Sequence, residues 1–405
     1  MPVASDSPQV QSPLRVAVVG GCGHIGLPLG LLLCDRGHTV TLVDVNASAV
    51  KSISEGKVPF FEHGADELLP KCLASGRLKL TVAADAVRDQ DVVLVTIGTP
   101  VDEYLDPDIR TFDRVIDDVV QWMGDGQLLM IRSTVFPGVT ERLARRVANR
   151  GIKAHVAYCP ERIAQGYALR ELTELPQIVS GCTPEAEQMA TRFFRELGAR
   201  VIPLAPVEAE LAKLFTNSFR YINFAISNQF YMLAERYGAD FGRVYDAVTF
   251  DYPRMKGFAR SGFAGGPCLL KDTMQLASFN HNLLTLGQNA MMINEGLPRF
   301  IVDQLKAKGS LVDSTAGILG MAFKGDCDDP RSSLSYKLRK VLTLECREVL
   351  CTDPYIRDPS FVSLEECVAK SDVLILGSCH SEYKALVTDK PVVDVFGFLK
   401  KPAAC

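Results

Sequence analysis

Three features that the sequence lacks narrow the class of protein that it can encode. No apolar run approaches the roughly 20 residues that a membrane-spanning helix needs. The nearest, "IGLPLGLLLC", is ten residues long and contains two glycines and a proline. Residues 1–13 have neither a basic start nor an apolar core, so we expect a disordered tail there and not a signal peptide. The net charge of -4 leaves no basic footprint, so we expect no nucleic acid and no membrane among the partners.

The twelve cysteines lack the spacing of a metal site or a redox pair. They are scattered along the chain and none belongs to a CxxC pair, so we predict no bound metal. Without a secretory signal, they are expected to be free thiols in a reducing cytoplasm. A single cysteine is ordinarily a small buried hydrophobic residue, so a chemical role for any of them needs support from its surroundings.

The first part of the chain predicts a strand, a glycine turn, a helix and a second strand. "RVAVVG", "GCGHIG", "LPLGLLLCDRG" and "HTVTLVD" supply these elements in order. Gly21 would permit the tight turn, Gly23 would admit a pyrophosphate, and Gly26 would let the helix pack on the strand. Asp44 ends the second strand, where a carboxylate binds the ribose hydroxyls and repels a 2′-phosphate. NAD is therefore the predicted cofactor, the alternative being a glycine turn that serves packing alone.

Two α/β stretches flank a helical middle. The chain has 405 residues, 47% hydrophobic and 23% charged, the balance of a globular protein with two or three domains. Strand candidates alternate with helices to about residue 205, which predicts a mostly parallel, doubly wound sheet. From Pro206 to Tyr237 apolar residues recur at helical steps, which predicts a helix of about 30 residues, roughly 45 Å long. Such a helix would join two domains and offer a dimer surface.

The predicted fold is α/β, with two Rossmann-like doubly wound domains joined by the long central helix and a helical middle region. Further helices are expected at 269–283 and 287–307, and "TAGILGMAF", "REVLCTD", "SDVLILG" and "PVVDVFG" are expected as strands. The predicted boundaries are 1–13 for the tail, 14–205 for the NAD-binding domain, 206–308 for the central dimerisation and active-site region, and 309–405 for the second Rossmann-like domain.

One cysteine has unusual neighbours. In "GFAGGPCLLKD", residues 262–272, Cys268 follows a glycine-rich run and precedes a lysine and an aspartate. Glycines allow a ligand or another backbone to come close. From these residues alone, the thiol could be a nucleophile, a metal ligand or neither.

Several motifs in a fixed order resemble the UDP-glucose/GDP-mannose dehydrogenase family, the nucleotide-sugar 6-dehydrogenases. They are the GxGxxG turn, "STVFPGVTE", "YCPERIAQG", "EAELAKLFTNSF", "DYPRM", "GFAGGPCLLKD", "GMAFKGDCDDPRSS" and "TDPY", and the resemblance runs from about residue 15 to 397. It implies oxidation of a sugar C6 alcohol to the carboxylate by two NAD+ in one site. Cys268 matches the family's nucleophile, which forms a thiohemiacetal and then a thioester that water cleaves.

The resemblance also implies the roles of other residues. The expected catalytic residues are Cys268, Lys213, Asn217, Asp272, Glu161 and Thr134, with Lys213 stabilising the alkoxide and oxyanion, Asp272 helping to activate water and Glu161 positioning water or acting as base. The expected cofactor-binding residues are Gly21, Gly23, His24, Ile25, Gly26, Asp44, Thr99, Thr134, Lys271 and Arg331. The expected substrate-binding residues are Glu161, Arg162, Lys213, Asn217, Arg254, Phe258, Gly265 and Lys324. Arg254 matches an arginine that reaches the sugar of the neighbouring subunit, which implies a homodimer, and the C-terminal domain would hold the nucleotide sugar.

The sequence departs from the family pattern near the expected sugar pocket. Arg132 and Gln229 stand where many members have glutamate, and the loop before Cys268 reads Gly-Phe-Ala-Gly-Gly-Pro-Cys where the family pattern is Gly-Phe-Gly-Gly-Ser-Cys. "CPERIAQG" and "LPQIV" resemble the N-acetylhexosamine branch and "CLLKD" resembles the glucose and mannose branches. "IRSTVFPG" and "VVDVFGF" resemble the mannose branch. These motifs conflict, so the sugar stays open among glucose, mannose and an N-acetylhexosamine. The expected substrate is a nucleotide sugar, most simply a UDP-hexose such as UDP-glucose or a UDP-N-acetylhexosamine.

Two rival functions remain open at this point. A two-electron dehydrogenase of the 3-hydroxyacid type shares a Rossmann domain followed by helices, but it needs neither the thiol nor a second α/β domain. A non-catalytic nucleotide-sugar or NAD sensor would be expected to lose some of the catalytic residues, whereas Cys268, Lys213, Asn217 and Asp272 all stand.

Overall fold

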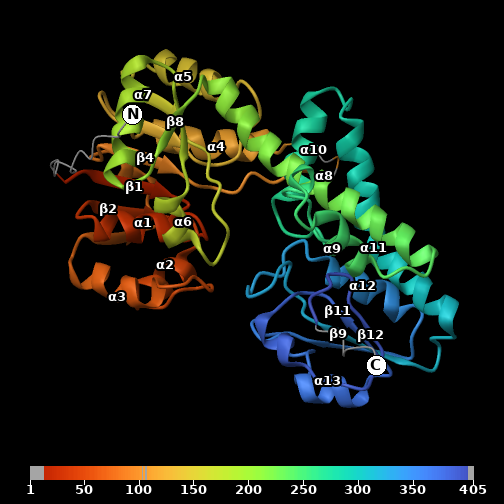
Figure 1. Cartoon of the computed structure of the whole chain (residues 1–405). Helices are drawn as coiled ribbons and strands as arrows, with labels where there is room; N and C mark the ends of the chain where they lie inside the picture. Colours follow the sequence, from red (N-terminus) through yellow and green to blue (C-terminus); the bar gives the residue numbers. More distant parts are fainter. Residues whose placement is uncertain (1–12, 103, 105–106, 400–405) are drawn as a thin grey trace. The chain divides into compact units, whose positions relative to one another are not determined.

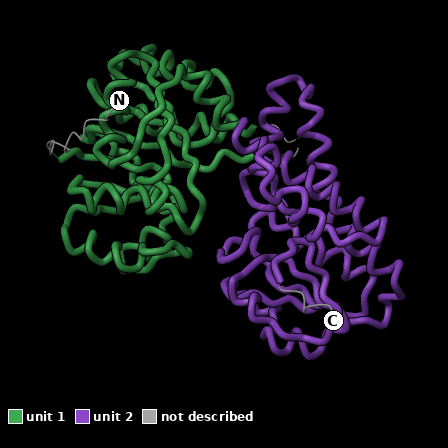
Figure 2. Tube along the Cα trace, viewed as in Figure 1, with its two compact units in different colours: residues 1–214 green, residues 215–405 purple. Residues whose placement is uncertain are grey.

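The computed structural model of the chain divides into two compact units. It describes residues 13–102, 104 and 107–399, so the predicted tail lies outside the described residues except for Pro13. Unit 1 comprises residues 1–214 and unit 2 residues 215–405 (Figure 2). The division falls within a single helix, α8 (Pro206–Arg236), which has 31 residues. The long helix predicted from the apolar periodicity is therefore present.

Unit 1 is built on an eight-stranded sheet with the order β3-β2-β1-β4-β5-β6-β7-β8 (Figure 1). Its strands are β1 (Arg15–Val19), β2 (Thr39–Val43), β3 (Leu78–Thr81), β4 (Val92–Val95), β5 (Leu128–Ile131), β6 (His155–Tyr158), β7 (Gln177–Gly181) and β8 (Val201–Pro203). Every neighbouring pair is parallel except β6 and β7. The order of the first six strands is that of dinucleotide-binding doubly wound domains, which confirms the predicted fold class.

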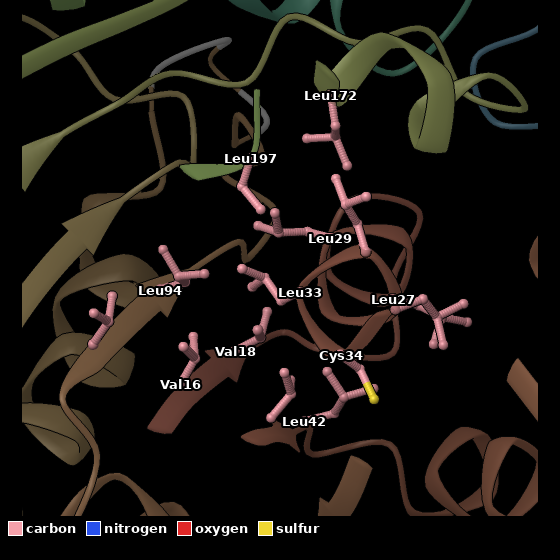
Figure 3. Packing of buried hydrophobic residues seen from close by; sticks show 14 of the residues in the cluster. Val16, Val18, Leu27, Leu29, Leu33, Cys34, Leu42, Leu94, Leu172 and Leu197 are labelled. Atoms are coloured by element: carbon pink, nitrogen blue, oxygen red, sulfur yellow. The ribbon is translucent and has the colours of Figure 1, made fainter. Parts of the chain in front are cut away.

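Helices cover both faces of this sheet because successive side chains of a strand point to opposite faces. Val16 and Val18 of β1 pack in one cluster with α1 (Gly26–Asp35), as Figure 3 shows. Ala17 and Val19 belong to the cluster on the other face, with α4 (Ile109–Val120) and α5 (Val139–Asn149). The remaining helical segments of unit 1 are α2 (Ala47–Ser54), α3 (Ala65–Ala74), η1 (Ala84–Val87), α6 (Ala168–Glu174) and α7 (Pro184–Glu196).

Unit 2 begins with helices around the distal part of α8. They are α9 (Phe241–Thr249), η2 (Pro253–Met255), α10 (Leu269–Phe279) and α11 (Thr285–Lys308). The buried Asn228 amide of α8 donates to the Asn294 side chain of α11 at 2.9 Å and to the Gly262 carbonyl at 3.0 Å. Its oxygen accepts from the Gly262 amide at 2.8 Å. One side chain thus fixes α8, α11 and the start of the loop that leads to Cys268.

A smaller parallel sheet completes unit 2, with the order β10-β9-β11-β12. Its strands and helices are β9 (Thr315–Leu319), α12 (Leu334–Thr343), β10 (Glu348–Thr352), α13 (Leu364–Lys370), β11 (Val373–Leu376), η3 (Ser381–Ala385) and β12 (Val392–Val393). All four predicted strands are present. Among the described residues, no helix has the length and apolarity that crossing a membrane requires.

Candidate active site

The glycine turn lies between β1 and α1 and is shaped by close backbone contacts. Gly20, directly before the Gly21 that we predicted to permit the tight turn, has a φ of 79° and is the left-handed residue there. A Cβ on Gly21 would lie 2.7 Å from the Cβ of Leu42, and one on Gly26 would clash with the Gly20 carbonyl. Gly23 differs, since the nearest atom to a Cβ there would be 3.6 Å away. Its exposed backbone leaves room for a pyrophosphate at the start of α1.

Asp44 sits beside this turn at the end of β2. Its carboxylate accepts from the Cys22 amide at 3.0 Å and from the Asn46 amide at 3.0 Å. It is therefore held next to the glycine turn, where the ribose of a dinucleotide lies in this fold. These residues fit NAD.

Further residues of unit 1 support the turn and its surroundings. Thr96, a buried residue that we did not predict, has a hydroxyl that can donate a hydrogen bond to either of two carbonyl oxygens. They are those of Val19, at 3.0 Å, and Gly20, at 3.1 Å. The signal of Thr96 in the sequence is a polar residue directly after a buried strand. Thr99 donates to the Thr134 carbonyl at 2.7 Å, so the structure brings these two predicted residues together.

The other two turn residues that we predicted have modest local roles. Ile25 precedes the first residue of α1 as its N-cap. The His24 ring lies 4.1 Å from the Phe60 ring, centroid to centroid, which fixes the imidazole beside the turn.

Glu161 is paired inside unit 1 with Arg132. The two side chains form an ion pair and are 4% and 0% exposed. The guanidinium also lies 4.9 Å from the centroid of the Phe194 ring. We expected Arg132 to border the sugar, but its charge is turned inward to Glu161 because a buried guanidinium needs a counterion.

The backbone that follows Glu161 binds the second oxygen of its carboxylate. Its second oxygen accepts from the Arg162 amide at 2.7 Å and the Ile163 amide at 3.0 Å. The Arg162 guanidinium donates to the Pro176 carbonyl, and burial lowers its pKa despite the nearby Glu161.

A second buried carboxylate of unit 1, Glu210, was not predicted. It accepts from the Gly138 amide at 2.6 Å, the Thr140 amide at 2.8 Å and the Thr140 hydroxyl at 2.5 Å. Burial raises its pKa, although these hydrogen bonds oppose the shift. Glu210 thereby ties the first turns of α8 to the amino end of α5 and to the loop that carries Thr134. Its signal was its place in "EAELAK", one helical turn before Lys213, which is itself buried.

In unit 2, Cys268 is exposed and occupies the N-cap position of α10. A helix amino terminus stabilises an adjacent negative charge, including a thiolate. The preceding glycines are needed for close packing on the smaller α/β domain. A Cβ on Gly265 would lie 2.9 Å from the Ser332 carbonyl, and one on Gly266 would lie 2.6 Å from the Phe323 ring. Of the two possibilities that the sequence left open, a ligand or another backbone, a backbone and a ring lie closest to these glycines.

Asp272 lies one helical turn after Cys268 and is fully buried. The Asn217 amide donates to one of its oxygens at 2.5 Å, and the Lys271 ammonium lies 2.6 Å from the other. We predicted Lys271 as a cofactor residue, whereas the structure pairs it with Asp272. The Asn217 amide and the Lys271 ammonium thus lie on either side of this buried carboxylate.

Arg331, another predicted cofactor residue, is paired with a neighbouring carboxylate. Its guanidinium binds the Asp329 carboxylate at 2.6 Å. That hydrogen bond raises the pKa of Arg331 against the effect of burial, and the charge of Asp329 adds to the rise. The structure therefore brings some of the predicted residues together, Thr99 with Thr134 in unit 1, and Asn217 and Lys271 with Asp272 in unit 2.

Comparison with known proteins agrees with this arrangement along the chain. Residues 14–198 match the NAD binding domain of the UDP-glucose/GDP-mannose dehydrogenase family, residues 207–296 its central domain, and residues 317–401 its UDP binding domain. The chain belongs to this family. The resemblance inferred from the motifs is thereby confirmed, as is NAD as cofactor.

Two solved relatives span nearly the same length. The UDP-N-acetyl-D-mannosamine dehydrogenase of Pyrococcus horikoshii is 31% identical over 410 residues, which cover 96% of this chain and 97% of the relative. Its structure matches with a TM-score of 0.89. A UDP-glucose dehydrogenase from Pyrobaculum islandicum matches with a TM-score of 0.89 and 28% identity, covering 97% of this chain and 96% of the other.

The remaining predicted substrate residues of this dehydrogenase family member contact aromatic rings. Arg254 is exposed and lies 4.8 Å from the centroid of the Tyr252 ring. The Phe258 ring stacks on Tyr245 with centroids 5.5 Å apart. Lys324 lies in the UDP binding domain, with its ammonium 6.0 Å from the Phe323 centroid.

Proposed function

We propose that the chain catalyses the NAD-dependent four-electron oxidation of the C6 hydroxymethyl of a UDP-sugar to the uronic acid. The observation that carries this proposal is the exposed Cys268 thiol at the start of α10, followed one turn later by the buried Asp272–Asn217–Lys271 group. A two-electron alcohol oxidation has no use for a thiol at this position. Bound NAD+ would supply the hydride acceptor in each of the two oxidations.

The thiol makes the second oxidation possible. After the first oxidation, the Cys268 thiolate adds to the C6 aldehyde and forms a thiohemiacetal. Loss of a second hydride leaves a thioester, and attack by water releases the carboxylate and the free thiol. Overall, one alcohol and one water yield one carboxylate, two hydrides that leave with the cofactor, and three protons.

The predicted polar residues would activate the water and stabilise the negative charge that develops on the substrate oxygen. Asp272 would accept the proton of the attacking water, with Asn217 orienting its carboxylate. Lys213, one turn before Asn217 on α8, would stabilise the alkoxide and the oxyanion. Glu161 fits a water-positioning role better than that of a base, because its two oxygens already accept hydrogen bonds from Arg132, Arg162 and Ile163.

For the sugar, we propose a UDP-N-acetylhexosamine, with UDP-N-acetylmannosamine as the first candidate. The 31%-identical relative carries that activity in its name, and "CPERIAQG" and "LPQIV" resemble the same branch. UDP-glucose is the second candidate because another full-length structural match is a UDP-glucose dehydrogenase. We further propose a homodimer in which Arg254 reaches the sugar bound by the partner subunit.

The test is a panel of nucleotide sugars incubated with NAD+ and followed by absorbance and product analysis. We expect turnover with a UDP-N-acetylhexosamine and two NADH per uronic acid, with little free aldehyde. One NADH and a stable aldehyde would contradict the thioester mechanism and support the two-electron alternative. Binding of nucleotide sugar and NAD without turnover would support the sensor.

A further inference from the structure

A buried pair lies at the carboxyl edge of the smaller sheet, outside the catalytic group described above. Asp353 directly follows β10 and His380 follows β11, and both side chains are 0% exposed. β9 lies between β10 and β11, so the chain crosses over β9 and creates a topological switch point there. Ligands of open α/β sheets bind at the carboxyl ends of strands beside such a point, and this region belongs to the family's UDP binding domain.

Asp353 accepts hydrogen bonds from backbone amides at the ends of two strands. One of its oxygens accepts from Met321 at 2.7 Å and Ala322 at 3.0 Å, just after β9. The other accepts from Tyr355 at 2.9 Å and Ile356 at 2.9 Å. Burial alone would raise the pKa of this carboxyl, but the hydrogen bonds from His380 and the amides hold it below its usual value. The carboxylate is therefore a fixed acceptor that anchors the start of the loop after β9.

His380 anchors the other end of the same loop. Its Nδ1 accepts from the Asp326 amide at 3.0 Å, so the ring proton resides on Nε2, which lies 3.1 Å from Asp353. The Asp326 carboxylate in turn accepts from the Ser381 amide at 2.7 Å and from the Ser381 hydroxyl at 2.5 Å. The loop is thus fastened at Met321 and at Asp326, with Lys324 between the two points.

The middle of this loop packs closely against the segment that precedes His380. A Cβ on Gly325 would clash with the Cys379 carbonyl, so the backbone next to Lys324 lies directly on the segment that precedes His380. Asp326 has a φ of 50°, a left-handed conformation that costs energy for a residue with a side chain. The contacts to His380 and Ser381 offset that cost.

We propose that His380 and Asp353 are positioning residues that hold loop 321–326 in the conformation that binds the diphosphate of the nucleotide sugar. The inference rests on the proposed function and on the expectation from the family resemblance that Lys324 binds the nucleotide sugar. A loop ordered before binding loses less conformational entropy when the ligand arrives, which raises affinity. The pair should therefore set the affinity for UDP and the KM for the sugar nucleotide, while kcat and the KM for NAD+ stay unchanged.

The experiment measures binding of UDP to the full-length protein by calorimetry, alongside steady-state kinetics. In His380→Gln, the longer amide can still reach Asp353 but presents no acceptor at the Nδ1 position, so we expect the Kd for UDP to rise at least tenfold. In His380→Asn, the side-chain oxygen can replace Nδ1 as acceptor for the Asp326 amide. We therefore expect the change in log Kd for UDP, relative to the native protein, to be less than half of the change in His380→Gln.

Two further variants separate positioning from general stability. Asp372→Asn alters a carboxylate that accepts from the Thr315 amide at 2.8 Å at the opposite, amino edge of the same sheet, and its Kd for UDP should stay within twofold of the native value. Asp326→Ala leaves both buried side chains intact but releases Ser381, and it should weaken UDP binding at least fivefold. It also serves as the test if His380→Gln does not fold.

The outcomes distinguish this inference from the proposed function. A native protein that binds UDP but oxidises no nucleotide sugar would overturn the proposed function, while the UDP affinities of the variants would still decide the role of the pair. Folded His380→Gln or Asp326→Ala proteins with native UDP affinity would overturn the inference. An unchanged KM combined with a lowered kcat would overturn it as well.

Discussion

Arg132 and Glu161 place opposite charges inside unit 1, and each is stable there only because of the other. Removing one partner of a buried pair leaves an uncompensated charge and costs about 3–5 kcal/mol. Arg132→Met keeps most of the side-chain volume beside Phe194. We therefore expect it to lower the free energy of unfolding by about 3 kcal/mol or more, measured by urea denaturation.

The control for this substitution is an exposed pair. Arg170 and Glu174 are 62% and 61% exposed, and such pairs contribute less than about 1 kcal/mol. Arg170→Met should accordingly change the free energy of unfolding very little. Equal effects of the two substitutions would mean that the Arg132–Glu161 pair does not stabilise the interior.

Cys268→Ser tests the proposed nucleophile. Serine is close in size to cysteine, and its hydroxyl is almost wholly protonated near neutral pH, so turnover should collapse by several orders of magnitude. Any adduct would give an ester, which hydrolyses far less readily than a thioester, and it would appear as added mass on the intact protein. Because Cys268 is exposed and the glycines carry the backbone requirement, NAD binding and thermal stability should persist. Near-native turnover would mean that Cys268 is an exposed thiol without a catalytic role.

Among the local elements, the β1–α1 turn depends on its glycines for two separate reasons, which two alanine substitutions can resolve. At Gly26, a Cβ would clash with the Gly20 carbonyl, so Gly26→Ala should shift the turn and lower both Tm and NAD affinity. At Gly23, a Cβ meets nothing closer than 3.6 Å. Gly23→Ala should therefore keep a Tm within about 2 °C of the native value, yet weaken NAD binding at least tenfold by occupying the pyrophosphate position.

Calorimetric titration with NAD+ and a thermal melt of each variant check this prediction. Native NAD+ affinity in Gly23→Ala would mean that a Cβ there does not reach the pyrophosphate position. Equal stability of Gly26→Ala and Gly23→Ala would mean that the backbone clash at Gly26 is harmless.

At the scale of the whole molecule, α8 offers a surface through which two copies of the chain can form a dimer. One long helix exposes several large apolar side chains, including Phe215 at 54%, Phe219 at 66% and Phe230 at 48%. Exposed apolar groups of this size mark interaction surfaces. We expect a dimer by light scattering, and Phe219→Glu should shift it to the monomer by burying a charge in the interface.

The matched control is Val387→Glu, which introduces the same charge at a residue that is 93% exposed outside α8 and should leave the dimer intact. If Arg254 acts across the interface, mixing Arg254→Ala and Cys268→Ala chains should restore part of the activity in hybrid dimers. A fully active monomer would contradict both expectations.

Much of the fold follows from local patterns in the sequence. The GxGxxG spacing, the apolar periodicity of α8 and the β-branched runs of β1, β2 and β9 each concern residues close together in the chain, so the backbone preferences of a few neighbours suffice to predict them. The same holds for Cys268 and Asp272, which share one helical turn. The reversal of β7 against β6 left no such signal, because strand direction depends on long connections and not on the strand itself.

The partners of the buried charges could not be predicted, because they come from distant parts of the chain. Arg132 and Glu161 are separated by 29 positions, Asn217 and Asp272 by 55, and Glu210 and Thr140 by 70. Each of these polar groups would be costly to bury alone, yet composition and spacing do not say which of many possible partners is brought beside it. Periodicity and glycine spacing reach only a few residues along the chain. The pairing of Arg132 with Glu161, the donors around Asp272 and the hydrogen bond between His380 and the loop that carries Lys324 arise only when the sheets and helices pack. Packing removes the competing water and brings these partners within reach.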